Sequence, residues 1–210
     1  MIFGFFKTKI SNKRHYVIVM TFVVLLFIGL YILPAAMSHL GSYTNNVNLS
    51  EFYESDDRKL YARSAPVRIE IPSITLDTTF VPSLGLNSDQ TVAVPDSYTQ
   101  VGWYNGGATP GEIGPAVILG HVDSIDGPAV FYSLGQTKVG DEIIVTRADD
   151  TVAVFVVIKL QRFPQINFPT SDVYGPADKP VLRLVTCSGV FDKSAQKYSH
   201  NLVVFAELKQ

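Results

Sequence analysis

The chain has 210 residues, of which 47% are hydrophobic, and a formal net charge of −2 at pH 7. This length leaves room for one medium-sized domain with accessory segments. The chain has no surplus of cationic residues to attract nucleic-acid phosphates, which argues against a nucleic-acid binder. The single cysteine, Cys187, excludes an internal disulfide and a zinc site built from several cysteines.

The N-terminal region has the layout of a membrane anchor. Residues 1–15 are basic, and residues 16–37 contain no charged side chain. An apolar run of roughly 20 residues fits a bilayer core of about 30 Å, and cations in front of it place the N-terminus in the cytoplasm. We therefore predict a cytoplasmic tail over 1–15 and an uncleaved, single-pass transmembrane signal anchor over 16–37. A cleaved signal peptide is the alternative, because small residues at 33–38 resemble a cleavage site.

Residues 38–65 are mostly polar and show no hydrophobic period. We predict an extracellular stalk or linker that holds the following domain off the membrane. A self-inhibitory segment that lies over the active site is the alternative.

From Pro66 to Gln210, short apolar runs alternate with glycine and proline. These runs predict strands over 67–71, 75–80, 91–94, 116–119, 142–147, 151–161, 181–186 and 202–208. Residues 148–150 fit a hairpin turn. About eight strands with little helix predict an all-β domain over 66–210, either a closed β-barrel or a sandwich.

The loop over 102–111 is rich in glycine and aromatic residues. Trp103 can either plug the end of the domain or help to wall an active site, and both interpretations stay open. The glycines do not form a phosphate-binding loop, because no Gly-Lys-Ser/Thr follows them.

Two of the predicted strands end on residues that carry chemistry. The strand in 181–189 (VLRLVTCSG) delivers Cys187, and the strand in 116–124 (AVILGHVDS) delivers His121. A free cysteine is usually a small buried hydrophobe, but a thiol and an imidazole at two strand ends are what nucleophilic cysteine catalysis requires. His200 is the rival to His121, since it precedes the last strand.

Several motifs occur together and in order. They are 120–124 (GHVDS) with 127–131 (GPAVF), 168–170 (FPT) with 173–175 (VYG), 182–187 (LRLVTC), and the closing 203–208 (VVFAEL). Over about 67–208 the chain thereby resembles a sortase, a membrane-anchored cysteine transpeptidase of Gram-positive-type cell surfaces, and the class F branch in particular. The resemblance implies an eight-stranded sortase-type β-barrel with short helices.

The resemblance also implies a reaction. Sortases cut a Leu-Pro-any-Thr-Gly-like sorting signal after its threonine and form a thioacyl enzyme, which a peptidoglycan or pilin amine then resolves. By this pattern Cys187 is the nucleophile and His121 protonates the departing amine. No cofactor is expected, and no acidic cluster has spacing that indicates a metal site. Housekeeping anchoring and pilus polymerisation both remain open, and the lack of an Asp-Pro-Gly-type lid favours anchoring.

One position departs from the family pattern. Sortases carry an arginine at the start of the last strand, and alignment of the apolar run puts Asn201 in its place. The nearest arginine in sequence is Arg183, which shares a strand face with Cys187 by parity. Arg183 as a substrate clamp and Asn201 as a donor near the developing oxyanion are both candidates for the third catalytic role.

The missing arginine also motivates an alternative function, a catalytically silent barrel that binds peptides or wall polymers. An L,D-transpeptidase is not favoured, because it would need a Ser-His-Gly-Cys-like cluster. Asp123, Ser124 and Thr186 are expected to make turn and strand-end hydrogen bonds rather than to act directly.

Overall fold

The computed structural model describes residues 61–209, and the structural statements below concern that part of the chain. The predicted cytoplasmic tail, the transmembrane anchor over 16–37 and the linker up to residue 60 lie outside it. Within 61–209, no helix combines the length and the apolar character needed to cross a membrane.

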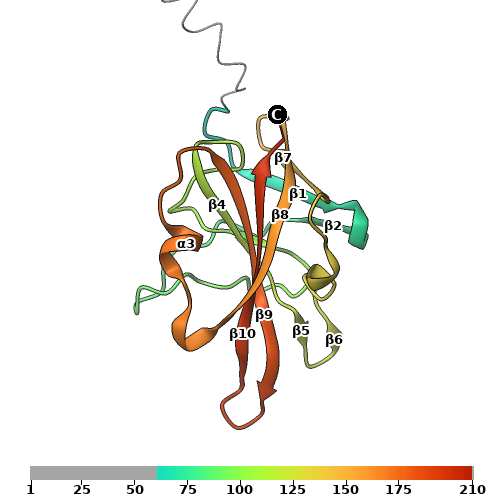
Figure 1. Ribbon diagram of the computed structural model, residues 1–210, viewed down its shortest axis with the longest axis vertical. Coiled ribbons are helices and arrows are strands. Elements are labelled where there is room, and N and C mark those ends of the chain that lie inside the picture. The colour runs from blue at the N-terminus through green and yellow to red at the C-terminus, as the bar shows by residue number, and fades with distance from the viewer. Residues whose placement is uncertain (1–60, 210) are drawn as a thin grey trace, which may run out of the picture. The chain divides into compact units, whose positions relative to one another are not determined.

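The described chain is built on one curled eight-stranded sheet, a half-barrel with few helices (Figure 1). In sheet order the strands are β2 (Leu76–Thr79), β1 (Pro66–Ile71), β7 (Glu142–Arg147), β8 (Val152–Pro164), β10 (Lys197–Leu208), β9 (Pro180–Asp192), β4 (Gly114–Leu119) and β3 (Gly102–Trp103). Neighbours pair antiparallel, except β4 and β9, which are parallel. The remaining elements are the hairpin β5 (Asp123–Ser124) and β6 (Gly127–Pro128), and the short helices η1 (Pro72–Ile74), η2 (Leu134–Gln136), η3 (Gln165–Asn167) and α3 (Thr170–Tyr174).

The all-β prediction is confirmed, but the sheet is a half-barrel and not a fully laddered closed barrel. Strands β2 and β3 form its two edges. Among the described residues, the chain after β2 meets the β3 region through isolated bridges, Phe80 to Val101 and Leu84 to Tyr104. Pro82 lies between the two bridging residues and cannot donate to a ladder, which accounts for the interruption.

The predicted strands are mostly recovered with shifted ends. The strand predicted over 142–147 coincides with β7. The strand predicted over 91–94 is wrong, because this segment is irregular and makes a single bridge, from Leu86 to Val92. Strand β3 was not predicted, since it is two residues long and lies in a loop rich in glycine.

Strand β9 continues beyond its predicted last residue, 186, and strand β10 begins before its predicted first residue, 202. Their outer parts form a hairpin in which Phe191 pairs with Tyr198 and Asp192 with Lys197. The hairpin protrudes at the lower end of Figure 1 and is largely exposed. Its sequence therefore lacks the apolar alternation from which a strand is predicted.

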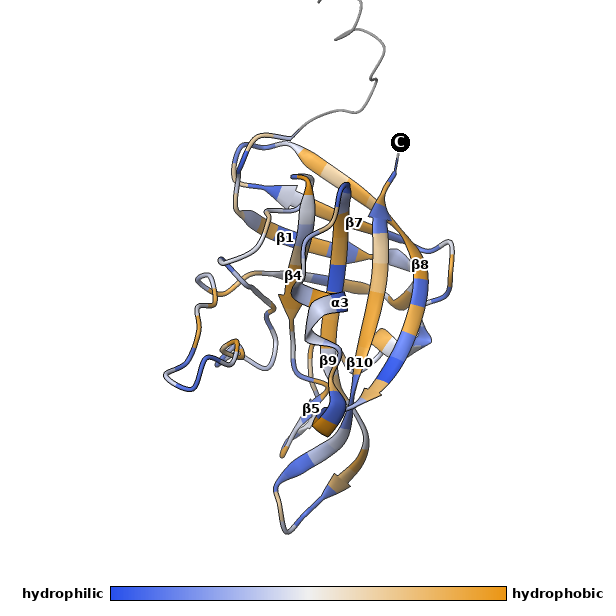
Figure 2. Cartoon of the chain, turned by 60° about the vertical axis from the view of Figure 1, so that its left-hand side comes forward, coloured by the Kyte–Doolittle hydropathy of each residue, from blue (hydrophilic) through white to orange (hydrophobic). Residues whose placement is uncertain are grey.

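Strand β4 and the inner parts of β9 and β10 are largely buried on both faces. Towards the inside of the half-barrel, Ala116, Leu182 and Val204 belong to the main core. On the outer face, Val185 and Val203 pack in a second apolar cluster with residues of α3 and the loops around it. Burial on both faces explains why these strands read as continuous apolar runs (Figure 2).

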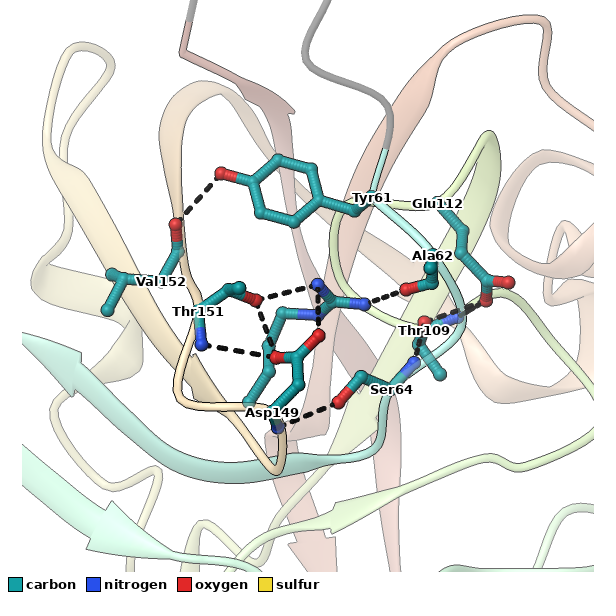
Figure 3. A network of polar contacts seen from close by, with 9 residues as sticks. Tyr61, Ala62, Ser64, Thr109, Glu112, Asp149, Thr151 and Val152 are labelled. Atoms are coloured by element: carbon teal, nitrogen blue, oxygen red, sulfur yellow. Dashed lines mark hydrogen bonds and ion pairs between the residues drawn. The ribbon is translucent and has the colours of Figure 1, made fainter.

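The N-terminal end of the described chain is fixed to the sheet by a buried arginine. Arg147, at the end of β7, is 1% exposed and donates to the carbonyl of Ala62, while its guanidinium lies 4.9 Å from the ring centre of Tyr61. Asp149 and Thr151 complete the network shown in Figure 3. Residues 61–64 belong to the predicted linker, and among them Tyr61 and Ala62 contact the guanidinium of Arg147, which is buried in the sheet.

This contact predicts where a stable fragment must begin. A chain starting at Pro66 should have a free energy of unfolding about 2 kcal/mol lower than a chain starting at Tyr61, because the buried guanidinium loses a charged hydrogen bond. Urea unfolding followed by circular dichroism measures the difference. Arg147→Met is the control: it should destabilise the longer chain more than the shorter one, because the shorter chain has already lost the contacts of Arg147 with Ala62 and Tyr61 and keeps those with Asp149 and Thr151. Equal stability of the two chains would contradict the role given to Arg147.

Candidate active site

Three adjacent strands bring the two predicted catalytic residues into one row. The parallel register pairs Leu119 of β4 with Val185 of β9. Two residues further along the same register, His121 lies beside Cys187, on strands about 4.8 Å apart. On the other side of β9, Asn201 of β10 is the direct partner of Cys187. His121, two residues past the end of β4, therefore forms one row with Cys187 of β9 and Asn201 of β10 on the outer face of the sheet.

A pocket of about 630 Å³ opens over this row, and all three residues line it. One wall is the segment between β2 and β3, from Leu86 to Pro95, and the other is formed by η3 and α3, from Gln165 to Tyr174. The lining is mostly apolar. None of the described residues that line it is Asp, Glu, Lys or Arg.

The aromatic loop contributes to the pocket in part. Tyr104 lines the pocket. Trp103 does not line it; its ring is 6% exposed and its Nε1 donates to the carbonyl of Ala108 at 2.9 Å. The interpretation of Trp103 as a plug is the one that its position favours.

The imidazole of His121 is held by residues that directly follow the segment 91–94. Its Nε2 lies 2.7 Å from the carbonyl oxygen of Pro95, and its ring centre lies 4.6 Å from that of Tyr98. Because a carbonyl can only accept, Nε2 carries a proton in this contact, and Nδ1 is the ring nitrogen left to exchange a proton with another group. Pro95 and Tyr98 thus fix the tautomer and the tilt of the ring.

The thiol of Cys187 is half-buried. Burial, with the negative charge of Asp123 acting in the same direction, raises the pKa of Cys187 above its ordinary value. The resting thiol is therefore protonated at neutral pH and needs a base to become the nucleophile.

Asp123 is tied to the last strand rather than to the reacting groups. It accepts a hydrogen bond from the hydroxyl of Tyr198, which raises the pKa of Tyr198 to about 12. Ser124 accepts from the amide of Asp126 at 3.1 Å, within the β5–β6 turn. These turn and strand contacts agree with the structural roles predicted for the two residues. Thr186 differs, because its buried hydroxyl has no hydrogen-bond partner among the described residues.

His200 does not share the site. It pairs with Ser188, one residue beyond Cys187 along the sheet, and its Nδ1 lies 2.7 Å from the hydroxyl of Ser199. Successive residues of a strand point to opposite faces, so His200 faces away from the row that holds Asn201. It is not among the residues that line the pocket.

Arg183 lies on the face of Cys187 but far along it. Its register partners are Val117 and Phe205, four residues or about 13 Å from Cys187 along the strand. Its guanidinium stacks over the ring of Phe205 at 4.6 Å, and burial lowers its pKa. Arg183 does not line the pocket.

Several residues around the row were not found from the sequence. Gln165 donates from Nε2 to Oδ1 of Asn201 at 3.1 Å and lines the pocket. Pro95, Tyr98 and Tyr198 lie outside the motifs; Pro95 and Tyr98 belong to the loop before β3, and Tyr198 belongs to the outer part of β10. The sequence offers one indication of Gln165 as a site residue, namely that it is a polar residue directly after Pro164, where β8 ends. Among the described residues, no group of three or more His, Cys, Asp or Glu could hold a metal ion.

Comparisons with known proteins agree on one family. The model of the Sortase domain family matches residues 69–209. Sortase C-1 from Actinomyces oris is 21% identical, with a TM-score of 0.52 over 69% of this chain and 71% of that chain. A lid mutant of sortase A from Corynebacterium diphtheriae is 19% identical, with a TM-score of 0.53 over 79% and 81%. Sortase C1 from Streptococcus agalactiae is 20% identical, with a TM-score of 0.52 over 69% and 67%. No curated protein matches the sequence. At these identities the solved structures show the shared fold.

The charge next to the thiol can be tested directly. Asp123→Asn removes a negative charge that raises the pKa of Cys187, so the midpoint of the pH dependence of Cys187 alkylation by iodoacetamide should move to lower pH. Mass spectrometry of the modified protein at a series of pH values measures the midpoint. Asp126→Asn, in the turn of the same hairpin, is the matched control and should leave it in place. An unchanged midpoint in Asp123→Asn would show that burial alone sets the pKa.

Proposed function

Because the chain belongs to the sortase family, a family of cysteine transpeptidases that cleave sorting signals and transfer proteins to amine acceptors, we propose that it performs this reaction with Cys187 as the nucleophile and His121 as the acid–base group. The observation that carries the proposal is that His121, just after β4, and the strand partners Cys187 and Asn201 all line one pocket.

The proposed substrate is a Leu-Pro-any-Thr-Gly-like sorting signal on a secreted surface protein, cleaved after threonine. The mostly apolar pocket around Cys187, whose lining contains no Asp, Glu, Lys or Arg, suits a peptide that carries few charges. The acceptor is an amine of peptidoglycan or of a pilin subunit. The motifs at 120–124 and 182–187 support assignment to the class F branch.

The reaction follows from the neutral resting thiol. His121 takes the proton of Cys187 as Sγ attacks the threonine carbonyl, and the carbonyl oxygen becomes an oxyanion. The C–N bond then breaks as the imidazolium protonates the departing amine, which leaves a thioacyl enzyme. An acceptor amine attacks the thioester, its proton passes to His121, and the thiolate leaves and is reprotonated.

Asn201 is the better placed of the two candidates for the third role. It lies directly opposite Cys187 and lines the pocket, whereas Arg183 is stacked on Phe205 about 13 Å along the strand. We therefore propose that Asn201 donates to the oxyanion, and that any effect of Arg183 on the substrate is exerted farther along the groove.

We also propose the membrane topology indicated by the sequence: a cytoplasmic tail over 1–15, a single-pass anchor over 16–37, a linker over 38–65, and a catalytic domain over 66–210 outside the cell membrane. The alternative function, a silent barrel that binds peptides or wall polymers, is motivated by the absent arginine. The paired thiol and imidazole argue against it.

Removal of the reacting groups tests the assignment. Cys187→Ala should abolish formation of a thioacyl adduct with a sorting-signal peptide library, as seen by mass spectrometry, and leave the fold intact. His121→Ala should block the reaction comparably, while His200→Ala should retain most of the activity, because His200 lies outside the pocket. A more damaging effect of His200→Ala would reverse the choice of acid–base group.

The third role is tested by comparing Asn201→Ala with Arg183→Ala under single-turnover conditions. Loss of one oxyanion donor typically lowers the rate by about 10²–10³. We expect a loss of this size for Asn201→Ala and a smaller loss for Arg183→Ala. Normal acylation by Asn201→Ala together with failure of Arg183→Ala would return the role to the arginine.

A further inference from the structure

We propose that Gln165 is a positioning residue for the reaction: it holds the carboxamide of Asn201 so that the NH₂ group, and not the carbonyl oxygen, faces the scissile carbonyl. This inference rests on the proposed function and adds to it a residue outside the family motifs.

The contact is built by the sheet. Phe163 and Pro164 at the end of β8 pair with Asn201 and His200 of β10, which brings the next residue, Gln165, to the edge of the pocket. Its Nε2 then donates to Oδ1 of Asn201 at 3.1 Å. Both side chains are half-buried at the pocket wall.

The direction of this hydrogen bond determines what Asn201 presents. A carboxamide has an accepting oxygen on one side and two N–H donors on the other. With Oδ1 turned to Gln165, Nδ2 is free to point into the pocket beside Cys187. Rotated by 180°, the same group would present lone pairs to a developing negative charge, which would oppose attack instead of assisting it.

An arginine has no such ambiguity, because all polar atoms of its guanidinium are donors. A neutral amide in the place of the arginine therefore requires a second residue to fix its orientation. Gln165 is the residue that contacts Asn201 in the described structure and meets this requirement.

The sharpest test reverses the hydrogen bond. Gln165→Glu keeps the shape of the side chain, but an ionised carboxylate can only accept, so it should turn Nδ2 of Asn201 toward itself and Oδ1 toward the pocket. Gln165→Ala removes the constraint without reversing it. Gln161→Glu is the matched control, the same change on β8 at a residue that does not line the pocket.

Single-turnover acylation of the full-length protein by a Leu-Pro-any-Thr-Gly peptide is measured for all variants. We expect Gln165→Glu to lower the acylation rate about 10²-fold at pH 7, the size of a lost oxyanion donor, with little change in the Kd of the peptide. Gln165→Ala should lose less than Gln165→Glu, since its Asn201 samples both orientations and presents Nδ2 part of the time. Gln161→Glu should match the wild type.

The pH dependence separates positioning from structural damage. A protonated carboxyl can donate as the amide does, so the ratio of Gln165→Glu to wild-type rates should rise as the pH falls towards about 4.3, the ordinary pKa of glutamate. Wild-type rates in Gln165→Glu and Gln165→Ala, or a ratio that does not change with pH, would overturn the inference while leaving the proposed function in place. A wild-type protein that forms no adduct with the peptide would overturn both.

Discussion

The site depends on the parallel pairing of β4 with β9. A parallel pair cannot be joined by a tight turn, and here the chain between the two strands contains β5 to β8 and the short helices η2, η3 and α3. The register that results places His121 next to Cys187, although the residues are far apart in sequence. A slip of one residue would turn either side chain to the other face of the sheet.

The register is specified so strongly because the paired strands are buried on both faces. Residues of one parity enter the main core and those of the other parity enter the second cluster under α3. Row by row along the outer face, Val117, Arg183 and Phe205 come first, then Leu119, Val185 and Val203, and then the row of Cys187. The pocket lies where this apolar cover ends, so the packing that fixes the register also leaves the thiol accessible.

The sequence was sufficient for the parts of the structure that depend on local pattern. Apolar runs predicted the strands that carry Cys187 and His121, and the motif order predicted the family. Local pattern could not show that β9 has Asn201 opposite Cys187 and Arg183 four residues away, because the partner of a residue depends on the pairing of distant strands. The apolar residues of 91–94, directly before Pro95, predict a strand, whereas this segment is irregular. The contact of Pro95 with His121 arises from a bend over the end of β4, for which no periodicity exists.

The uncharged lining of the pocket is consistent with a neutral amide, Asn201, at the position where the family pattern has an arginine. A guanidinium opposite Cys187 would stabilise the thiolate before substrate arrives, through the attraction of opposite charges. In this chain the residues that line the described pocket include no Asp, Glu, Lys or Arg, and burial raises the pKa of the Cys187 thiol. A resting neutral thiol is the state that such surroundings favour. In the proposed mechanism negative charge then develops only during attack, when a donor from Asn201 and a proton acceptor on His121 are both needed. A neutral amide suits this order of events, because it adds no charge that would have to be desolvated in an apolar pocket before the peptide binds.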